Sequence, residues 1–114
     1  MIHEPAALDQ MFQALSDRSR RGMIDRLGRG PASVSDLAGP LSMALPTVMK
    51  HLAVLEKSGL VRSEKSGRVR TYRLQTEALA QMERWLAERK ASWNRTFDRL
   101  EQFLADDQPE RRTT

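Results

Sequence analysis

The sequence contains no cysteine, which excludes disulfide bonds, thiolate metal sites and a cysteine nucleophile but leaves the redox compartment open. Its only histidines are His3 and His51, and neither has a second ligand three or four residues away, as a helical zinc site would require. No apolar run approaches the roughly 18 residues of a membrane-spanning helix. The N-terminal stretch MIHEPAALDQ lacks the basic-then-apolar pattern of a signal peptide. We therefore expect a cytoplasmic protein that binds no metal ion, cofactor or membrane.

Sequence patterns for catalysis are also missing. With no cysteine, and with neither histidine near a serine or a carboxylate pair, the chain offers no combination of nucleophile and base. The glycine patterns that bind nucleotide phosphates are absent as well. An enzyme is the least supported class of function.

Positive charge is concentrated in one third of the chain. The 114 residues carry a net charge of +4, and this length suits one small domain. Residues 43–74 hold seven Lys and Arg against two Glu, a net +5, whereas residues 1–42 are neutral and residues 75–114 carry −1. Such a concentration favours a phosphate-binding surface, with a merely solvated basic face as the alternative.

The basic segment opens with a predicted helix over residues 45–57. Val48, Leu52 and Leu55 recur at the spacing of a buried stripe. Pro46, Lys50, Ala53 and Lys57 lie nearly opposite, flanked by Thr47, Met49 and Val54. The exposed face is cationic and built of small side chains, which suits a DNA major groove. Pro46 is tolerated only in a first turn, and Gly59 marks the expected end of the helix.

Three shorter helices are predicted before it. The first carries an apolar stripe from Leu8 to Leu15, and Ser16 or Asp17 can cap the second, which Gly28 and Gly30 end. Arginines 18, 20 and 21 on the second helix can reach DNA phosphates or form an ordinary charged surface. Ser33 and Asp36 resemble a capping box for the third helix, which we expect to stop at Gly39-Pro40. A short helix, a turn and the helix at 45–57 make a helix-turn-helix.

After Gly59 the pattern changes to the two-residue alternation of β-strands. Residues 60–65 and 69–74 predict two strands joined at Ser66-Gly67-Arg68, where glycine supplies the positive φ of a hairpin turn. A basic hairpin beside a recognition helix is a wing, and Arg68 at its tip can enter a minor groove. A hairpin that only aids solubility is the alternative.

The last predicted helix spans about residues 76–105, starts from a Thr76 cap and is about 45 Å long at ~1.5 Å per residue. Its apolar stripe outruns what so small a domain can cover, so we expect it to form a dimer interface with the first helix. The alternative is a helix that folds back on its own core. The expected interface consists of Leu8, Met11, Phe12, Leu86, Trp93, Phe97, Leu100 and Leu104.

Four segments together resemble the ArsR-type winged helix-turn-helix repressors: ALSDRSRRGMIDRL at 14–27, SVSDLA at 33–38, PTVMKHLAVLEKSGLV at 46–61 and GRVRTYRL at 67–74. The resemblance covers about residues 8–104. It implies a mainly α fold with a β-hairpin wing, forming one domain over residues 1–107, with a helix-turn-helix at about 33–58 and a wing at about 60–74. We expect residues 108–114 to be a flexible tail.

The resemblance also implies a homodimer that represses transcription from an inverted-repeat DNA site until a signal relieves it. Family contacts carried over by position, with His51 as a packed or phosphate-facing neighbour, give the expected DNA-binding residues: Leu45, Pro46, Thr47, Met49, Lys50, His51, Arg68 and Arg70.

Three departures from the family pattern bear on target and signal. Ala44 stands where many members have a small polar cap, and Met49 stands where many have serine, so Met49 is expected to touch a thymine methyl instead. Metal-responsive members use cysteines near the third helix or Asp and His along the last one, and this chain has neither set. We expect no metal sensing of those kinds. An unidentified small molecule near Trp85 and Trp93 is an option, although these residues suit a plain core or interface. The alternative function is a winged-helix module that docks onto protein, without a specific DNA target.

Overall fold

The computed structural model describes residues 5–106. Contacts divide the chain into two units, residues up to Met82 and residues from Glu83 onward, and each is described by itself. Both the expected flexible tail at 108–114 and His3 lie outside the described residues. No helix within residues 5–106 is long and apolar enough to cross a membrane.

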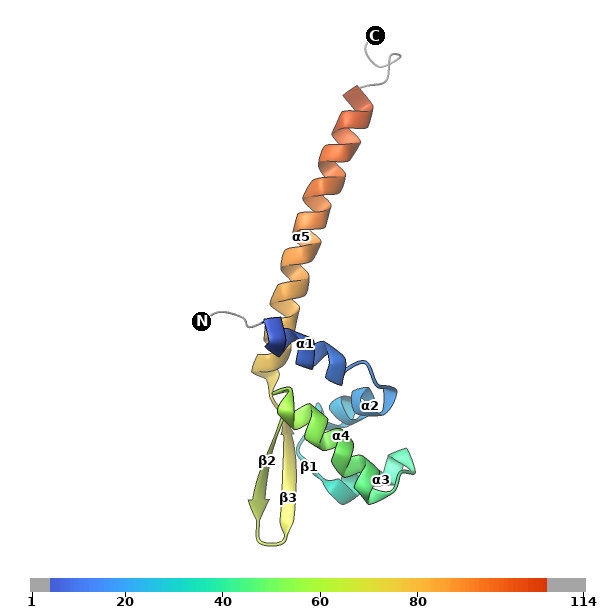
Figure 1. Cartoon of the computed structure of the whole chain (residues 1–114), viewed down its shortest axis with the longest axis vertical. Helices are drawn as coiled ribbons and strands as arrows, with labels where there is room; N and C mark the ends of the chain where they lie inside the picture. The colour runs from blue at the N-terminus through green and yellow to red at the C-terminus, as the bar shows by residue number, and fades with distance from the viewer. Residues whose placement is uncertain (1–4, 107–114) are drawn as a thin grey trace. The chain divides into compact units, whose positions relative to one another are not determined.

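The first unit holds four helices, three strands and the start of a fifth helix (Figure 1). Its elements in chain order are α1 (Pro5–Ala14), α2 (Arg18–Leu27), β1 (Ala32–Ser33), α3 (Val34–Leu41), α4 (Leu45–Lys57), β2 (Val61–Ser66), β3 (Val69–Leu74) and the beginning of α5 (Thr76–Asp106). The predicted winged helix-turn-helix, mainly α with a β wing, is confirmed.

Side-chain caps start two of these helices. The Asp17 carboxylate accepts a hydrogen bond from the Arg20 backbone N–H at 3.1 Å and caps α2. At α3, the Ser33 hydroxyl accepts from the Asp36 N–H while the Asp36 carboxylate accepts from the Ser33 N–H, both at 3.2 Å. The predicted capping box is confirmed. These backbone N–H donors lower the pKa of both carboxyl groups, because they stabilise the charged form.

The predicted end of the third helix at Gly39-Pro40 is wrong, because α3 continues through Pro40 to Leu41. A proline so close to the end of a helix removes only one late backbone donor, which is a small loss. The chain leaves the helix at Ser42, whose backbone is left-handed (φ 52) and whose N–H donates to the Gly39 carbonyl at 3.3 Å.

The sheet has three strands in the order β1-β3-β2, all antiparallel, where the sequence predicted two. The strand that was not predicted is β1, in which Ala32 pairs with Tyr72 and Ser33 pairs with Thr71. A two-residue strand has no alternation to detect, and it exists only because α2 and α3 bring it beside β3. The β2–β3 hairpin forms as predicted, shifted by one residue at β2, with Gly67 at φ 62 in the turn.

The predicted buried stripe of α4 is confirmed. Val48, Leu52 and Leu55 are all 0% exposed. They pack in one core with residues of α2, α3, β2 and β3 and with the residue just before β2, namely Met23, Leu27, Leu37, Val61, Tyr72 and Leu60. Because its whole inner face is buried, α4 is held in a single rotation, and that rotation decides which side chains face outward.

The helix α5 begins at Thr76 itself, so Thr76 is its first residue and not the predicted cap, and the helix ends at Asp106. Ala78 and Met82 are buried in the first unit. In the second unit six large apolar side chains remain about half exposed or more, whereas Trp85 is partly buried: Leu86 49%, Trp93 56%, Phe97 65%, Leu100 51%, Phe103 66% and Leu104 52%.

Candidate nucleic-acid interface

The outward face of α4 is the centre of the candidate interface. Residues Leu45, Pro46, Thr47, Met49 and Lys50 are all exposed, with Met49 at 56%. Ala44 precedes the helix and offers no side-chain cap, and its carbonyl accepts from the N–H groups of Thr47 and Val48. Because Pro46 has no N–H, the first turn offers at most the Leu45 N–H as a backbone donor. This face can meet a DNA groove with backbone, methyl, hydroxyl and ammonium groups.

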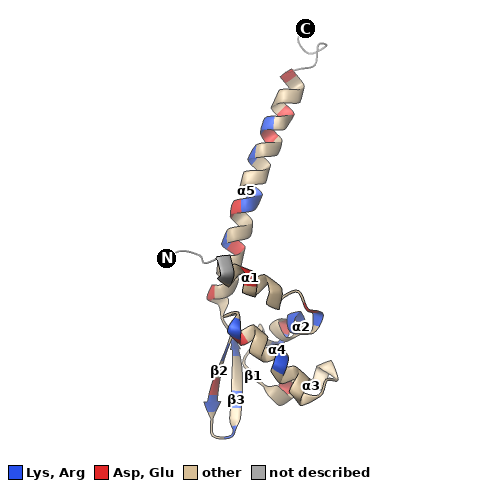
Figure 2. Cartoon of the chain, in the orientation of Figure 1, with Lys and Arg blue, Asp and Glu red and all other residues tan. Residues whose placement is uncertain are grey.

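Basic side chains gather along α4 and the wing. Figure 2 shows Lys and Arg on α4 and on the β2–β3 hairpin, with few acidic residues among them. Within residues 5–106 Lys50 makes no ion pair, so its charge is available to an external anion. The net positive charge of residues 43–74 is thus carried mainly by α4 and the β2–β3 hairpin of the first unit.

His51 lies closer to the protein than its neighbours in α4. Its side chain is 17% exposed, and its Nδ1 lies 3.2 Å from Nη1 of Arg20 and 3.9 Å from the Asp17 carboxylate. Arginine can only donate a hydrogen bond, so Nδ1 accepts, and the proton of a neutral ring sits on Nε2. His51 was expected to be either packed or facing a phosphate. Its Nδ1 is packed against Arg20, and its Nε2–H has no described acceptor within residues 5–106.

Sequence reasoning missed the structural role of Arg20. Its Nε donates to the Ala14 carbonyl at 2.6 Å and its Nη2 to the Gln13 carbonyl at 3.2 Å, while Nη1 reaches His51. In the same way Arg21 donates to the Leu15 carbonyl at 2.8 Å. Both guanidinium groups therefore satisfy carbonyls at the C-terminal end of α1, where a helix leaves acceptors without partners. The available signal was two arginines a few residues after that helix end.

The two wing arginines differ in their surroundings. Arg70 donates to the Ser63 hydroxyl at 2.9 Å, and Ser63 donates to the Glu56 carboxylate at 2.7 Å, so Arg70 belongs to a chain of hydrogen bonds that joins the wing to α4. Arg68 sits in the turn with no ion pair or hydrogen bond described within residues 5–106. On the inner side, burial raises the pKa of the Tyr72 hydroxyl, with the Glu56 charge adding to the effect. The wing is thus linked to α4 through Arg70 and Ser63, while the Arg68 guanidinium at its tip is free to bind an external anion.

Comparison with known proteins identifies the family. Residues 15–64 match a family described as a helix-turn-helix domain. The chain is 40% identical over 72 residues to the HTH-type transcriptional regulator Rv2034 of Mycobacterium tuberculosis, which is 63% of this chain and 67% of the relative. It is 49% identical to the solved ArsR family transcriptional regulator RHA00566, covering 82% of this chain and 97% of that one, with a TM-score of 0.77. This chain belongs to the ArsR family of transcriptional regulators.

As an ArsR-family protein it is a DNA-binding transcriptional regulator, a class that does not work by catalysis. Another relative is the arsenical resistance operon repressor of Escherichia coli, 38% identical over 66 residues. That match covers 57% of this chain and 56% of the repressor, little more than half of either.

Residues 5–106 contain no group of three His, Cys, Asp or Glu side chains that could hold a metal ion. Near the tryptophans, the Arg89 guanidinium lies 5.4 Å from the Trp85 ring centroid, and Trp93 is 56% exposed.

Proposed function

We propose that this protein is a homodimeric repressor that binds an inverted-repeat DNA operator through α4 and the wing of each copy. The observation that carries the proposal is the outward face of α4, which is exposed and cationic while its inner face is fully buried. A helix held in this way can enter a major groove with a defined set of side chains. The net +5 of residues 43–74 adds attraction to phosphates.

Each expected contact residue has a role in this proposal. Thr47, Met49 and Lys50 face the base edges or the groove, with Met49 against a thymine methyl. Leu45 and Pro46 approach the DNA backbone at the start of α4. The remaining contacts come from Arg68 in the minor groove and, toward phosphates, from His51 Nε2–H and the free N–H groups of Arg70.

Dimerisation is proposed through α5 and part of α1. The supporting observation is the row of half-exposed apolar side chains on α5, since such a surface is a common mark of a protein interface. On α1, Phe12 is 37% exposed and Leu8 packs partly against the core. Met11 is different: at 5% exposure it is a core residue, so the proposed interface omits it.

Repression, as the direction of regulation, rests on the relative named a repressor, and a cytoplasmic location rests on the regulator class. We also propose that the chain has no catalytic activity. The deciding experiment is fluorescence anisotropy of the purified full chain on its own upstream DNA and on scrambled DNA of equal length, at two salt concentrations. Preference for the upstream DNA that persists at the higher salt supports the proposal.

A variant pair locates the recognition helix within that assay. Lys50→Ala should weaken specific binding, whereas Lys90→Ala, which removes the same charge from α5, should leave it unchanged. Equal loss in both variants would show that only overall charge matters. Equal binding to both DNAs that collapses with salt would argue against a specific operator in that region and favour the protein-docking alternative.

A further inference from the structure

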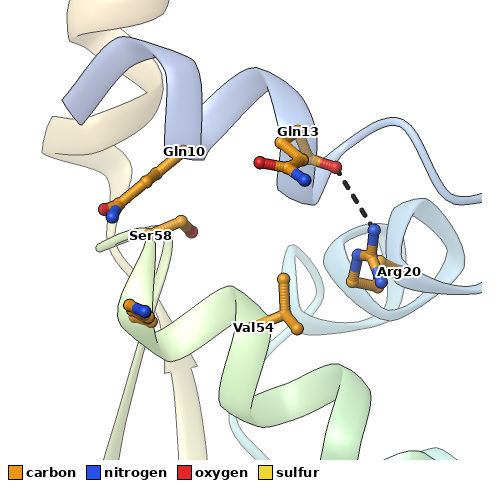
Figure 3. Close-up of a pocket in the computed structure, with 6 residues that line it drawn as sticks. Gln10, Gln13, Arg20, Val54 and Ser58 are labelled. Atoms are coloured by element: carbon orange, nitrogen blue, oxygen red, sulfur yellow. Dashed lines mark hydrogen bonds between the residues drawn. The ribbon is translucent and has the colours of Figure 1, made fainter. Parts of the chain in front are cut away.

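A hollow of about 360 Å³ lies between α1, α2 and the C-terminal half of α4, within the first unit. Figure 3 shows Gln10 and Gln13 on α1, Arg20 on α2 beneath Gln13, and Val54 rising from α4. The full lining is Gln10, Gln13, Arg20, Val54, Lys57 and Ser58. Its volume falls at the lower end of the range for small-molecule sites, about 300–1,000 Å³.

The lining contains two cations and no carboxylate. Within residues 5–106 Lys57 has no described ion pair or hydrogen bond through its side chain. Asp17, which caps α2, lies beside Arg20 and interacts with its charge, whereas the Glu56 carboxylate accepts from Ser63. Lys57 is thus the lining cation without a described partner, and a lining with two cations and no carboxylate favours an anion.

Arg20 still has donors to offer in this hollow. A guanidinium carries five N–H groups. The contacts to Ala14, Gln13 and His51 account for three of them. Planar, paired donors of this kind match a carboxylate well, and the carboxamides of Gln10 and Gln13 add further hydrogen-bonding groups.

One wall of the hollow is apolar. Val54 is 39% exposed and presents its methyl groups to the same space. Inorganic phosphate would leave this wall without a partner, whereas an organic acid covers it with carbon. We propose that the hollow binds a small organic carboxylate, whose charge lies between Arg20 and Lys57 and whose apolar part packs on Val54.

The same site has a route to the DNA-binding face. Arg20 connects the hollow to His51, which follows Lys50 directly in α4. A carboxylate that draws Arg20 into the hollow competes with the His51 contact, so occupancy changes how α4 is held. This second step rests on the proposed DNA-binding function, whereas the binding step does not.

The binding step is tested by NMR titration of the ¹⁵N-labelled full chain with benzoate and, separately, with uncharged benzamide at constant ionic strength. Benzoate should shift the amides of residues 10, 13, 54, 57 and 58 together and to saturation, with benzamide at least fivefold weaker. Absence of saturable shifts there, or equal binding of the two probes, would overturn the site.

Three variants sharpen the result. Lys57→Gln should weaken benzoate at least threefold, and Val54→Trp should abolish its binding by filling the hollow while keeping the charge. Lys65→Gln makes the same charge change on β2, outside the hollow, and should have no effect. If Lys65→Gln weakens benzoate as much as Lys57→Gln does, the attraction is diffuse and the site is refuted. Should Val54→Trp not fold, the Lys57 and Lys65 pair decides alone.

The coupling step uses the same variants on DNA. Saturating benzoate should change operator affinity at least threefold in the native chain and leave Val54→Trp unaffected. Saturable binding in the NMR titration without any change on DNA would overturn the coupling and leave the site standing. If Lys57→Gln loses DNA affinity as strongly as Lys50→Ala without any ligand, the hollow holds a DNA phosphate and the carboxylate proposal fails.

Discussion

Replacing Arg68 by alanine tests whether the wing tip enters the minor groove, where its charge offsets that of the phosphates, and how many wings engage one operator. Arg68 is exposed, follows Gly67 in the hairpin turn, and has no described partner within residues 5–106. Its removal therefore breaks no described contact of the folded chain, and stability should not change. Any loss of DNA affinity then reports on a contact made to DNA.

The magnitude follows from counterion release. For duplex DNA, each phosphate contact contributes about 0.9 to the slope of log affinity against log salt concentration. A homodimer with both wings bound loses two contacts, so the slope becomes shallower by about 1.8, whereas one bound wing gives about 0.9. Over a fourfold rise in salt, the affinity defect should shrink by about 12-fold for two wings and by roughly 3.5-fold for one.

The assay is anisotropy on operator DNA at four salt concentrations, with the slope compared between native protein and variant. Arg99→Ala is the matched control, since Arg99 is an exposed arginine on α5 that belongs to the second unit. An unchanged slope for Arg68→Ala would refute the wing contact. An equal change for Arg99→Ala would refute the assignment of the effect to the wing.

Three further predictions concern stability and assembly. Leu52→Ala should cost about 2–5 kcal/mol of unfolding free energy in urea denaturation, because the side chain is 0% exposed; a loss below about 1 kcal/mol would contradict its core role. Phe97→Asp should dissociate the dimer without unfolding the first unit, because Phe97 is 65% exposed; an unchanged mass in sedimentation equilibrium would argue against α5 as the interface. The Ser33 donors lower the Asp36 pKa, so the stability Asp36 contributes is full above its ordinary pKa of 3.8 and is lost as pH falls through the lower, folded pKa. Asp36→Asn should therefore lose less stability than the native chain as pH drops below about 4 in thermal unfolding, and identical pH profiles would contradict this reasoning.

Features governed by neighbours in the sequence were predictable. The α4 stripe of Val48, Leu52 and Leu55, the cap at Asp17 and the capping box at Ser33 depend on helical periodicity and on hydrogen bonds spanning three residues. The glycine turn of the wing is local in the same sense. Because these signals need no knowledge of packing, they located α4 and its outward face correctly.

Contacts between residues that are far apart in the sequence became known only from the tertiary structure. The Arg20 contact with His51 spans 31 residues. From the sequence Arg20 was expected to face DNA or solvent, but in the structure it holds the end of α1 and contacts α4. The pairing of β1 with β3, the burial of Met11 and the hollow beside Val54 likewise exist only once the helices have packed. The sequence by itself determined which side of α4 faces outward, because local periodicity assigns the faces of a helix. Tertiary packing determined the Arg20–His51 contact that supports α4 and the hollow beside Val54, because these features join residues that no local sequence pattern relates.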